Sequence, residues 1–203
     1  ACLAVKRLYV FEKVYDEFVK GLVDKVSRYE CGDGMKKAEK PKIRMGPLHT
    51  SDQRAEIEAQ VKDAVGRGAK LLLGGSRPEG AGYEKGFYYQ PTILSDVPDD
   101  SRAVQEETFG PLLPVFRVKS LDEAIERANG SIYGLGSSIW TKNLDNIETA
   151  IDRLQAGNVW VNSLHYGYDE LPFGGVKASG FGREHGPEAL DYYLEPKGVV
   201  ITR

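Results

Sequence analysis

Cys2 is the candidate nucleophile of the chain, which carries one other cysteine, Cys31. A thiolate attacks carbonyl carbon readily, although a lone cysteine beside an apolar segment is more often a small buried residue. A second chemical signal is the acidic pair Glu106 and Glu107 just before Phe109. Taken alone, this pair predicts only a solvated helix end. Neither signal is specific until its sequence context is considered.

That context is a series of motif blocks spread along the chain. They read C-L-A-V-K-R-L-Y-V over 2–10, E-E-T-F-G-P over 106–111, Y-G-L over 133–135, G-N-V-W-V-N over 157–162 and P-F-G-G-V-K-A-S-G-F-G-R-E over 172–184. In this order they resemble motifs of the aldehyde dehydrogenase superfamily, and the last block is the most specific of them. The chain is therefore identified as resembling the C-terminal, catalytic-domain portion of such an enzyme.

The resemblance implies a function and roles for three residues. An aldehyde would be oxidised to a carboxylic acid with NAD or NADP, through a thiohemiacetal and a thioester on Cys2. The backbone N–H of Cys2 would be one oxyanion donor. Glu107 would accept hydrogen bonds from the ribose hydroxyls beside the nicotinamide, and Phe109 would pack near that ring.

The same resemblance implies where the aldehyde enters. Phe173 would line the substrate tunnel, and residues 163–171, with His165 and Gly167 as binding residues, would form its mouth. Asp169 and Glu170 are charged, and residues 162–176 contain no lysine or arginine. This composition argues against an anionic aldehyde, which would favour a cationic anchor.

The family's general base, its oxyanion asparagine and most of its cofactor site belong to the part upstream of the nucleophile. We therefore expect the chain by itself to be inactive and to be part of a longer enzyme. Two alternatives stay open: a non-catalytic subunit-interaction domain, and a cysteine-dependent hydrolase with a histidine base. The glycines of residues 180–186 do not predict a dinucleotide fingerprint, because no apolar strand precedes them.

Composition narrows the class of protein. The chain is 41% hydrophobic and 28% charged with a net charge of -3, which is typical of a globular protein and argues against a nucleic-acid or membrane partner. Two cysteines and three scattered histidines predict no metal site and no disulfide scaffold, and favour a cytoplasmic location.

Hydrophobic periodicity predicts an α/β fold with a largely parallel sheet flanked by helices, and the resemblance implies that this fold is like the aldehyde dehydrogenase catalytic domain. We expect a catalytic domain over 1–190, and the resemblance implies that a C-terminal segment over 191–203 contributes to a homodimer or homotetramer of the full-length enzyme. Strands are expected at 4–11, 71–73, 87–94, 112–118, 137–141, 158–162 and 199–202. The residues 32–44 and 74–86 are expected to be loops.

The four predicted helices have apolar stripes and end signals. The first helix has the stripe Val14/Phe18/Leu22/Val26, and the second has the stripe Ile57/Val61/Val65 after a capping box at Thr50 and Gln53. The third follows a capping box at Ser120 and Glu123 and runs to Ala128. The fourth has the stripe Leu144/Ile147/Ile151/Leu154.

Overall fold

The computed structural model describes residues 1–36, 42–164, 167 and 169–203. Within them the chain forms two compact units, residues 1–124 and residues 125–203. The predicted partition into a catalytic domain over 1–190 and a segment over 191–203 stays a prediction.

Unit 1 is built on a four-stranded sheet with the order β1 (Leu8–Phe11), β6 (Leu112–Val118), β5 (Thr92–Ser95) and β4 (Lys70–Leu73). The three strands β1, β6 and β5 are parallel, and β4 is antiparallel at the edge. The predicted largely parallel sheet is therefore confirmed. Strand β4 is at the edge of the sheet, and its Leu71 is half exposed.

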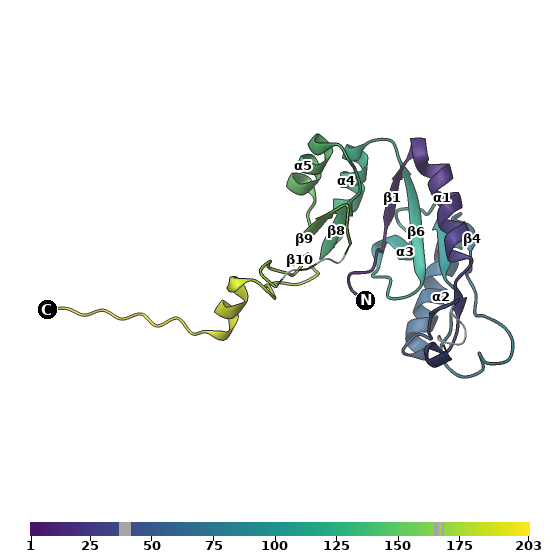
Figure 1. The fold of residues 1–203 in the computed structure, drawn as a ribbon, viewed down its shortest axis with the longest axis horizontal. Coiled ribbons are helices and arrows are strands. Elements are labelled where there is room, and N and C mark those ends of the chain that lie inside the picture. Colours follow the sequence, from purple (N-terminus) through teal and green to yellow (C-terminus); the bar gives the residue numbers. More distant parts are fainter. Residues whose placement is uncertain (37–41, 165–166, 168) are drawn as a thin grey trace. The chain divides into compact units, whose positions relative to one another are not determined.

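Helices cover both faces of this sheet (Figure 1). Helix α1 (Glu12–Val26) packs on one face, and α2 (Ser51–Gly66) with the short α3 (Arg102–Gln105) packs on the other. Side chains of β6 alternate between the two layers: Leu113 and Val115 join the cluster under α1, while Leu112 and Phe116 join the cluster under α2. This alternation is the period of two that a strand imposes.

The apolar stripe predicted for α1 is partly wrong. Val14 and Phe18 are exposed, and the buried face is formed by Tyr15, Val19, Leu22, Val23 and Val26. A repeat of four residues drifts about 40° around the helix at each step, since each residue turns about 100°. The mixed spacing of three and four residues stays on one face.

Helix α2 begins as predicted, because the N–H of Gln53 donates to Thr50 Oγ1 at 3.1 Å. Ile57 and Val61 are buried, but Val65 is exposed for the same geometric reason as Val14. Its place in the core is taken by Ala64 and by a polar residue, Gln60, both 0% exposed.

The segment predicted as one loop over 32–44 is more ordered at its ends. It contains a 3₁₀ turn, η1 (Gly34–Lys36), and most of a strand, β3 (Ile43–Met45), which pairs in parallel with β2 (Glu30–Cys31). Ile43 is 5% exposed and so belongs to the core. Residues 37–41 lie outside the described part of the chain.

Helix α4 (Leu121–Asn129) spans the boundary between the units, and its capping box is confirmed by a 3.1 Å bond from the Glu123 N–H to Ser120 Oγ. Unit 2 then contains β7 (Tyr133–Gly134), β8 (Gly136–Ile139), α5 (Leu144–Arg153), β9 (Asn158–Val161), β10 (Val176–Lys177) and the 3₁₀ helix η2 (Pro187–Tyr193). The pair β8 and β9 is parallel, and β7 pairs with β10 antiparallel. On α5 the predicted stripe is only partly internal, since Leu144 and Ile151 are exposed.

The strand predicted at 199–202 does not form. Residues 195–203 have no regular structure, and Val199, Val200 and Ile201 are exposed. A β-prone sequence needs a neighbouring ladder, and these residues pair with no strand in the described part of the chain. No helix among the described residues has the length and apolar character to cross a membrane.

Candidate functional site

The nucleophile segment (residues 1–7, with the candidate nucleophile Cys2) and the acidic loop (residues 106–111) lead into neighbouring strands at the same edge of the sheet. Cys2 precedes β1, and residues 106–111 precede β6, and these two strands are parallel neighbours with Leu8 opposite Val115. Parallel neighbours begin at one edge, so their leading segments lie close together. The fold of unit 1 therefore brings Cys2, Glu107 and Phe109 to one region.

The loop that carries Glu107 is held through its backbone carbonyls. Three consecutive carbonyl oxygens each accept a hydrogen bond from a side chain. Gln60 Nε2 donates to the oxygen of Glu107 at 3.4 Å, the Lys6 ammonium donates to that of Thr108, and Gln53 Nε2 donates to that of Phe109 at 2.6 Å. Both glutamines come from α2, whereas Lys6 comes from the nucleophile segment.

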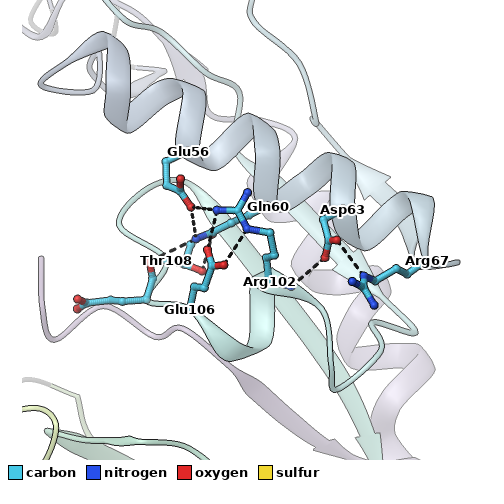
Figure 2. Close-up of polar contacts among 8 residues, drawn as sticks. Glu56, Gln60, Asp63, Arg67, Arg102, Glu106 and Thr108 are labelled. Atoms are coloured by element: carbon cyan, nitrogen blue, oxygen red, sulfur yellow. Dashed lines mark hydrogen bonds and ion pairs between the residues drawn. The ribbon is translucent and has the colours of Figure 1, made fainter.

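Gln60 is the buried centre of this arrangement (Figure 2). Its Oε1 accepts a 3.0 Å bond from Thr108 Oγ1, and its Nε2 also lies 3.3 Å from Glu56 Oε1. Gln60 is 0% exposed and Thr108 1% exposed. Buried polar groups that are satisfied in this way fix one backbone conformation, since the alternative leaves them unpaired.

The two adjacent acids have different surroundings. Glu106 pairs with Arg102 through Oε1 at 2.8 Å, and Arg102 also binds Glu56 at 2.7 Å. The hydrogen bond from Arg102 lowers the pKa of Glu106 below its usual range. Glu107 is exposed, and its carboxylate forms no hydrogen bond or ion pair within the described residues. The Glu106 carboxylate is therefore engaged by Arg102, and the Glu107 carboxylate is left available for a ligand.

The N-terminal end of α3, the short helix that precedes this loop, is held by a further set of polar contacts (Figure 2). The backbone N–H of Arg102 donates to Asp63 Oδ2 at 2.9 Å, and Asp63 also pairs with Arg67 at 2.9 Å. Hydrogen bonds from both arginines lower the pKa of Asp63, with that from the Arg67 side chain having the larger effect. The acidic loop therefore follows a short helix, α3, that is hydrogen-bonded to α2.

The two cysteines are also in contrasting environments. Cys2 is exposed, whereas Cys31 is buried, with its Sγ 3.4 Å from the carbonyl oxygen of Tyr89. Burial raises the pKa of the Cys31 thiol, which keeps it protonated and unreactive. Cys2 is thus the accessible thiol of the two.

In unit 2, the segment that contains Phe173 is held by close backbone contacts. A Cβ atom on Gly157 would lie 1.8 Å from the carbonyl oxygen of Gly174. Asn158 binds the same segment, since its Oδ1 accepts from the Gly174 N–H at 3.2 Å. Phe173 exchanges two backbone hydrogen bonds of 2.7 Å with Glu184. The glycine-rich block is therefore a tight backbone structure that includes the two-residue strand β10.

The predicted substrate residues are only partly described. Phe173 is half-buried and packs edge-on against the ring of His185, with centroids 6.5 Å apart. Gly167 is exposed, and a Cβ on it would have nothing within 4 Å. His165 lies outside the described residues. The binding roles of Phe173, His165 and Gly167 stay predictions.

Several positioning side chains were not predicted from the sequence. The block over 2–10 resembles the family motif through the pattern C-x-A-x-x-R-x-x-V, in which the position of Lys6 is free, so the pattern gave no signal for Lys6. Gln60 did leave a signal, because it stands three residues after Ile57 on the face of α2 that should be apolar. Arg102 lies on a helix of only four residues, which periodicity does not detect. Among the described residues, no group of three or more histidine, cysteine or acidic side chains is arranged to hold a metal.

Comparison with known proteins agrees with the motif blocks. The model of the aldehyde dehydrogenase family matches residues 1–199. The chain is 41% identical over 98% of its length to betaine aldehyde dehydrogenase of Bacillus subtilis, and 45% identical over 91% to the NADP(+) succinate-semialdehyde dehydrogenase of Deinococcus radiodurans. It covers 40% and 37% of these two relatives, so it spans about two-fifths of their length.

Solved structures show the same likeness. A 3,6-anhydro-L-galactose dehydrogenase in complex with NAP matches 96% of the chain and is itself covered to 40%, with a TM-score of 0.90 at 40% identity. A point mutant of Staphylococcus aureus betaine aldehyde dehydrogenase, in complex with NAD+ and with a BME-modified cysteine, matches 97% of the chain and is covered to 39%, with a TM-score of 0.88 at 34% identity. The chain therefore belongs to the aldehyde dehydrogenase family.

Proposed function

We propose that this chain is the nucleophile-bearing part of an enzyme that oxidises an aldehyde to a carboxylic acid with NAD or NADP. One observation carries the proposal. The accessible thiol of Cys2 stands on a segment whose Lys6 contacts the loop that presents Glu107 and Phe109. The non-catalytic interaction domain and the cysteine-dependent hydrolase remain as the competing functions. The hydrolase would need a histidine base. The histidine of unit 1, His49, is exposed, and its backbone N–H donates to Gln53 Oε1.

The chemistry follows from what a thiolate can do to an aldehyde. The Cys2 sulfur adds to the carbonyl carbon, which becomes a tetrahedral thiohemiacetal, and the backbone N–H of Cys2 donates to the oxygen that gains charge. Loss of the carbon-bound hydrogen with its electron pair then gives a thioester on Cys2. The nicotinamide group, when bound, supplies the acceptor for this hydride. Water hydrolyses the thioester and returns the free thiol with the carboxylic acid.

Glu107 and Phe109 fit the nicotinamide-riboside end of such a cofactor. The exposed carboxylate of Glu107 offers acceptors for two vicinal hydroxyls, and a loop pinned at three carbonyls holds it in place. The ring of Phe109 is 43% exposed and offers a flat apolar surface beside it.

The substrate side belongs to unit 2. We propose Phe173, His165 and Gly167 as aldehyde-binding residues. Asp169 is exposed beside this segment, with its Oδ1 3.2 Å from His185 Nδ1, and its acidic side chain favours a neutral or cationic aldehyde over an anionic one. The relatives named above act, by their names, on aldehydes of both charge types, so the test of this preference is a comparison of betaine aldehyde with succinate semialdehyde.

The decisive test of the nucleophile is Cys2→Ser in the full-length protein. Oxidation is expected to fall by about a thousandfold or more, because an alkoxide is far harder to form than a thiolate near neutral pH. Cys31→Ala is the matched control, since Cys31 is buried, and it should retain oxidation in the folded fraction. Aldehyde-dependent NADH or NADPH formation measures both. Wild-type turnover in the Cys2 variant would show that the nucleophile is misassigned, and no turnover in the wild type would favour the non-catalytic domain.

We further propose that residues 191–203 contribute to a homodimer or homotetramer of a cytoplasmic enzyme. The support is their composition and exposure: Val199, Val200 and Ile201 are β-prone, apolar and between 70% and 92% exposed. Deleting the residues after Pro196 in the full-length protein should reduce the oligomer's mass in light scattering. An oligomer of unchanged mass and thermal stability would remove the tail from the assembly.

A further inference from the structure

We infer that Lys6 is a positioning residue that ties the nucleophile segment to the cofactor loop and so sets the place of Glu107 and Phe109 beside Cys2. This inference rests on the proposed function and adds to it a residue that the family motifs leave free.

The contacts of Lys6 all fall on the two segments concerned. Its ammonium donates to the carbonyl oxygen of Thr108 and, at 3.3 Å, to that of Ala1, the residue before the nucleophile. The same nitrogen lies 4.5 Å from the centre of the Phe109 ring. One cation therefore contacts the two residues that follow Glu107 and the residue that precedes Cys2.

Lys6 has no equivalent among the other supports of this loop. Gln53 and Gln60 fix the loop to α2, which carries no part of the nucleophile. Of the three side chains that donate to the carbonyls of residues 107–109, Lys6 is the one that comes from the segment of Cys2. Removing its ammonium would leave the loop attached to α2 and would take away this side-chain link between the loop and the segment of Cys2.

The surroundings of Lys6 act on the pKa of its ammonium in two opposite directions. Burial lowers the pKa of Lys6, while the negative charges of Glu107 and of an ionised Cys2 act in the opposite direction. The half-buried ammonium of Lys6 donates to two carbonyl oxygens and lies over the face of a ring. Hydrogen bonds from a charged donor are of the stronger, charge-assisted kind.

The test uses the full-length enzyme and Lys6→Met, which keeps an apolar stem and removes the ammonium. We expect the KM for the nicotinamide cofactor to rise about tenfold, the size of effect that one lost charge-assisted hydrogen bond gives. The KM for the aldehyde should change less than twofold. Lys6→Arg, which keeps a cationic donor, should recover part of the loss. Lys20→Met on the exposed face of α1 is the matched control and should match the wild type.

A double-variant cycle separates positioning from general destabilisation. If Lys6 acts through the Glu107 loop, Lys6→Met should add less than twofold to the cofactor KM when Glu107→Gln is already present. The rate of Cys2 alkylation with and without cofactor gives a second readout, because the cofactor's effect on that rate should shrink in Lys6→Met. If Lys6→Met does not fold, Lys6→Gln, whose amide is too short to reach both carbonyls, must show the same shift.

Two results would overturn the inference while leaving the proposed function intact. One is a wild-type cofactor KM together with an unchanged alkylation pattern in an active Lys6→Met enzyme. The other is an equal, additive loss in every parameter, which is what simple destabilisation gives. The proposed function fails separately, if the wild-type enzyme is inactive or if Cys2→Ser retains its turnover.

Discussion

The loop over 106–111 in unit 1 and the glycine-rich segment over 172–184 in unit 2 both carry family motifs, but different interactions hold them in place. Side chains that donate to successive carbonyls hold the loop, and all of them come from other parts of unit 1. The segment is held by direct contact between backbones, with Gly157 against Gly174 and Gly174 against Gly182. The first arrangement can be weakened by degrees, one donor at a time. The second has no room for an added carbon at Gly157 or Gly174.

The largest effect should therefore come from Gly157→Ala. Its new Cβ would lie 1.8 Å from the Gly174 oxygen, so the strand and the segment must separate. Overpacking of this kind in a tight site costs about 3 kcal/mol of unfolding free energy. Thermal unfolding followed by circular dichroism measures the loss.

Gly198→Ala is the control for that substitution, because a Cβ there would have nothing within 4 Å and its backbone does not have a positive φ. It should leave the melting temperature of unit 2 unchanged. A Gly157→Ala protein as stable as this control would mean that the backbone approach between the two segments is not required.

The comparison also explains which features the sequence predicts. Strand β6 matches its predicted span of 112–118, because seven apolar-rich residues stand between a proline-containing turn and a capping box. The Thr50 cap of α2 is predicted just as well, since capping depends on residues three positions apart. These are local patterns, and local patterns are readable from one sequence.

Features that depend on distant partners were missed. Thr108 meets Lys6 and Gln60 across separations of 102 and 48 residues, and no periodicity encodes such pairs. The strand predicted at 199–202 was wrong for the opposite reason, since its local propensity is high but no strand in the described part of the chain pairs with it. Motif resemblance supplied Cys2 and Glu107, but it says nothing about the residues that hold them.

An intermediate effect is expected for Gln60→Leu, which tests the side-chain-held loop. The change keeps much of the volume but leaves the hydroxyl of Thr108 and the carbonyl of Glu107 without their partner. Buried groups left unpaired in this way cost about 2 kcal/mol of unfolding free energy. Denaturant unfolding measures the change.

The control is Gln105→Leu, the same substitution at an exposed glutamine whose amide binds one carbonyl, that of Asp99. It should change the unfolding free energy by less than about 0.5 kcal/mol. Equal losses in the two variants would show that Gln60 contributes no more than a surface glutamine, and the loop would then depend on Lys6 and Gln53.

The smallest effect on stability, and the sharpest separation of support from function, is expected for Glu107→Gln. Its carboxylate has no hydrogen bond or ion pair within the described residues, so the unfolding free energy should change by less than about 0.5 kcal/mol. In the full-length enzyme the cofactor KM should rise about tenfold, because a neutral amide accepts ribose hydroxyl bonds more weakly than a carboxylate. Alkylation of Cys2 without cofactor should be unchanged, since the thiol itself is untouched.

The adjacent Glu106→Gln is the matched control, and the reverse pattern is expected for it. It loses the ion pair with Arg102, which should cost a few tenths of a kcal/mol of unfolding free energy, as exposed pairs do. Its cofactor KM should stay near that of the wild type. Unchanged cofactor kinetics in Glu107→Gln would return both acids to an ordinary solvated helix end.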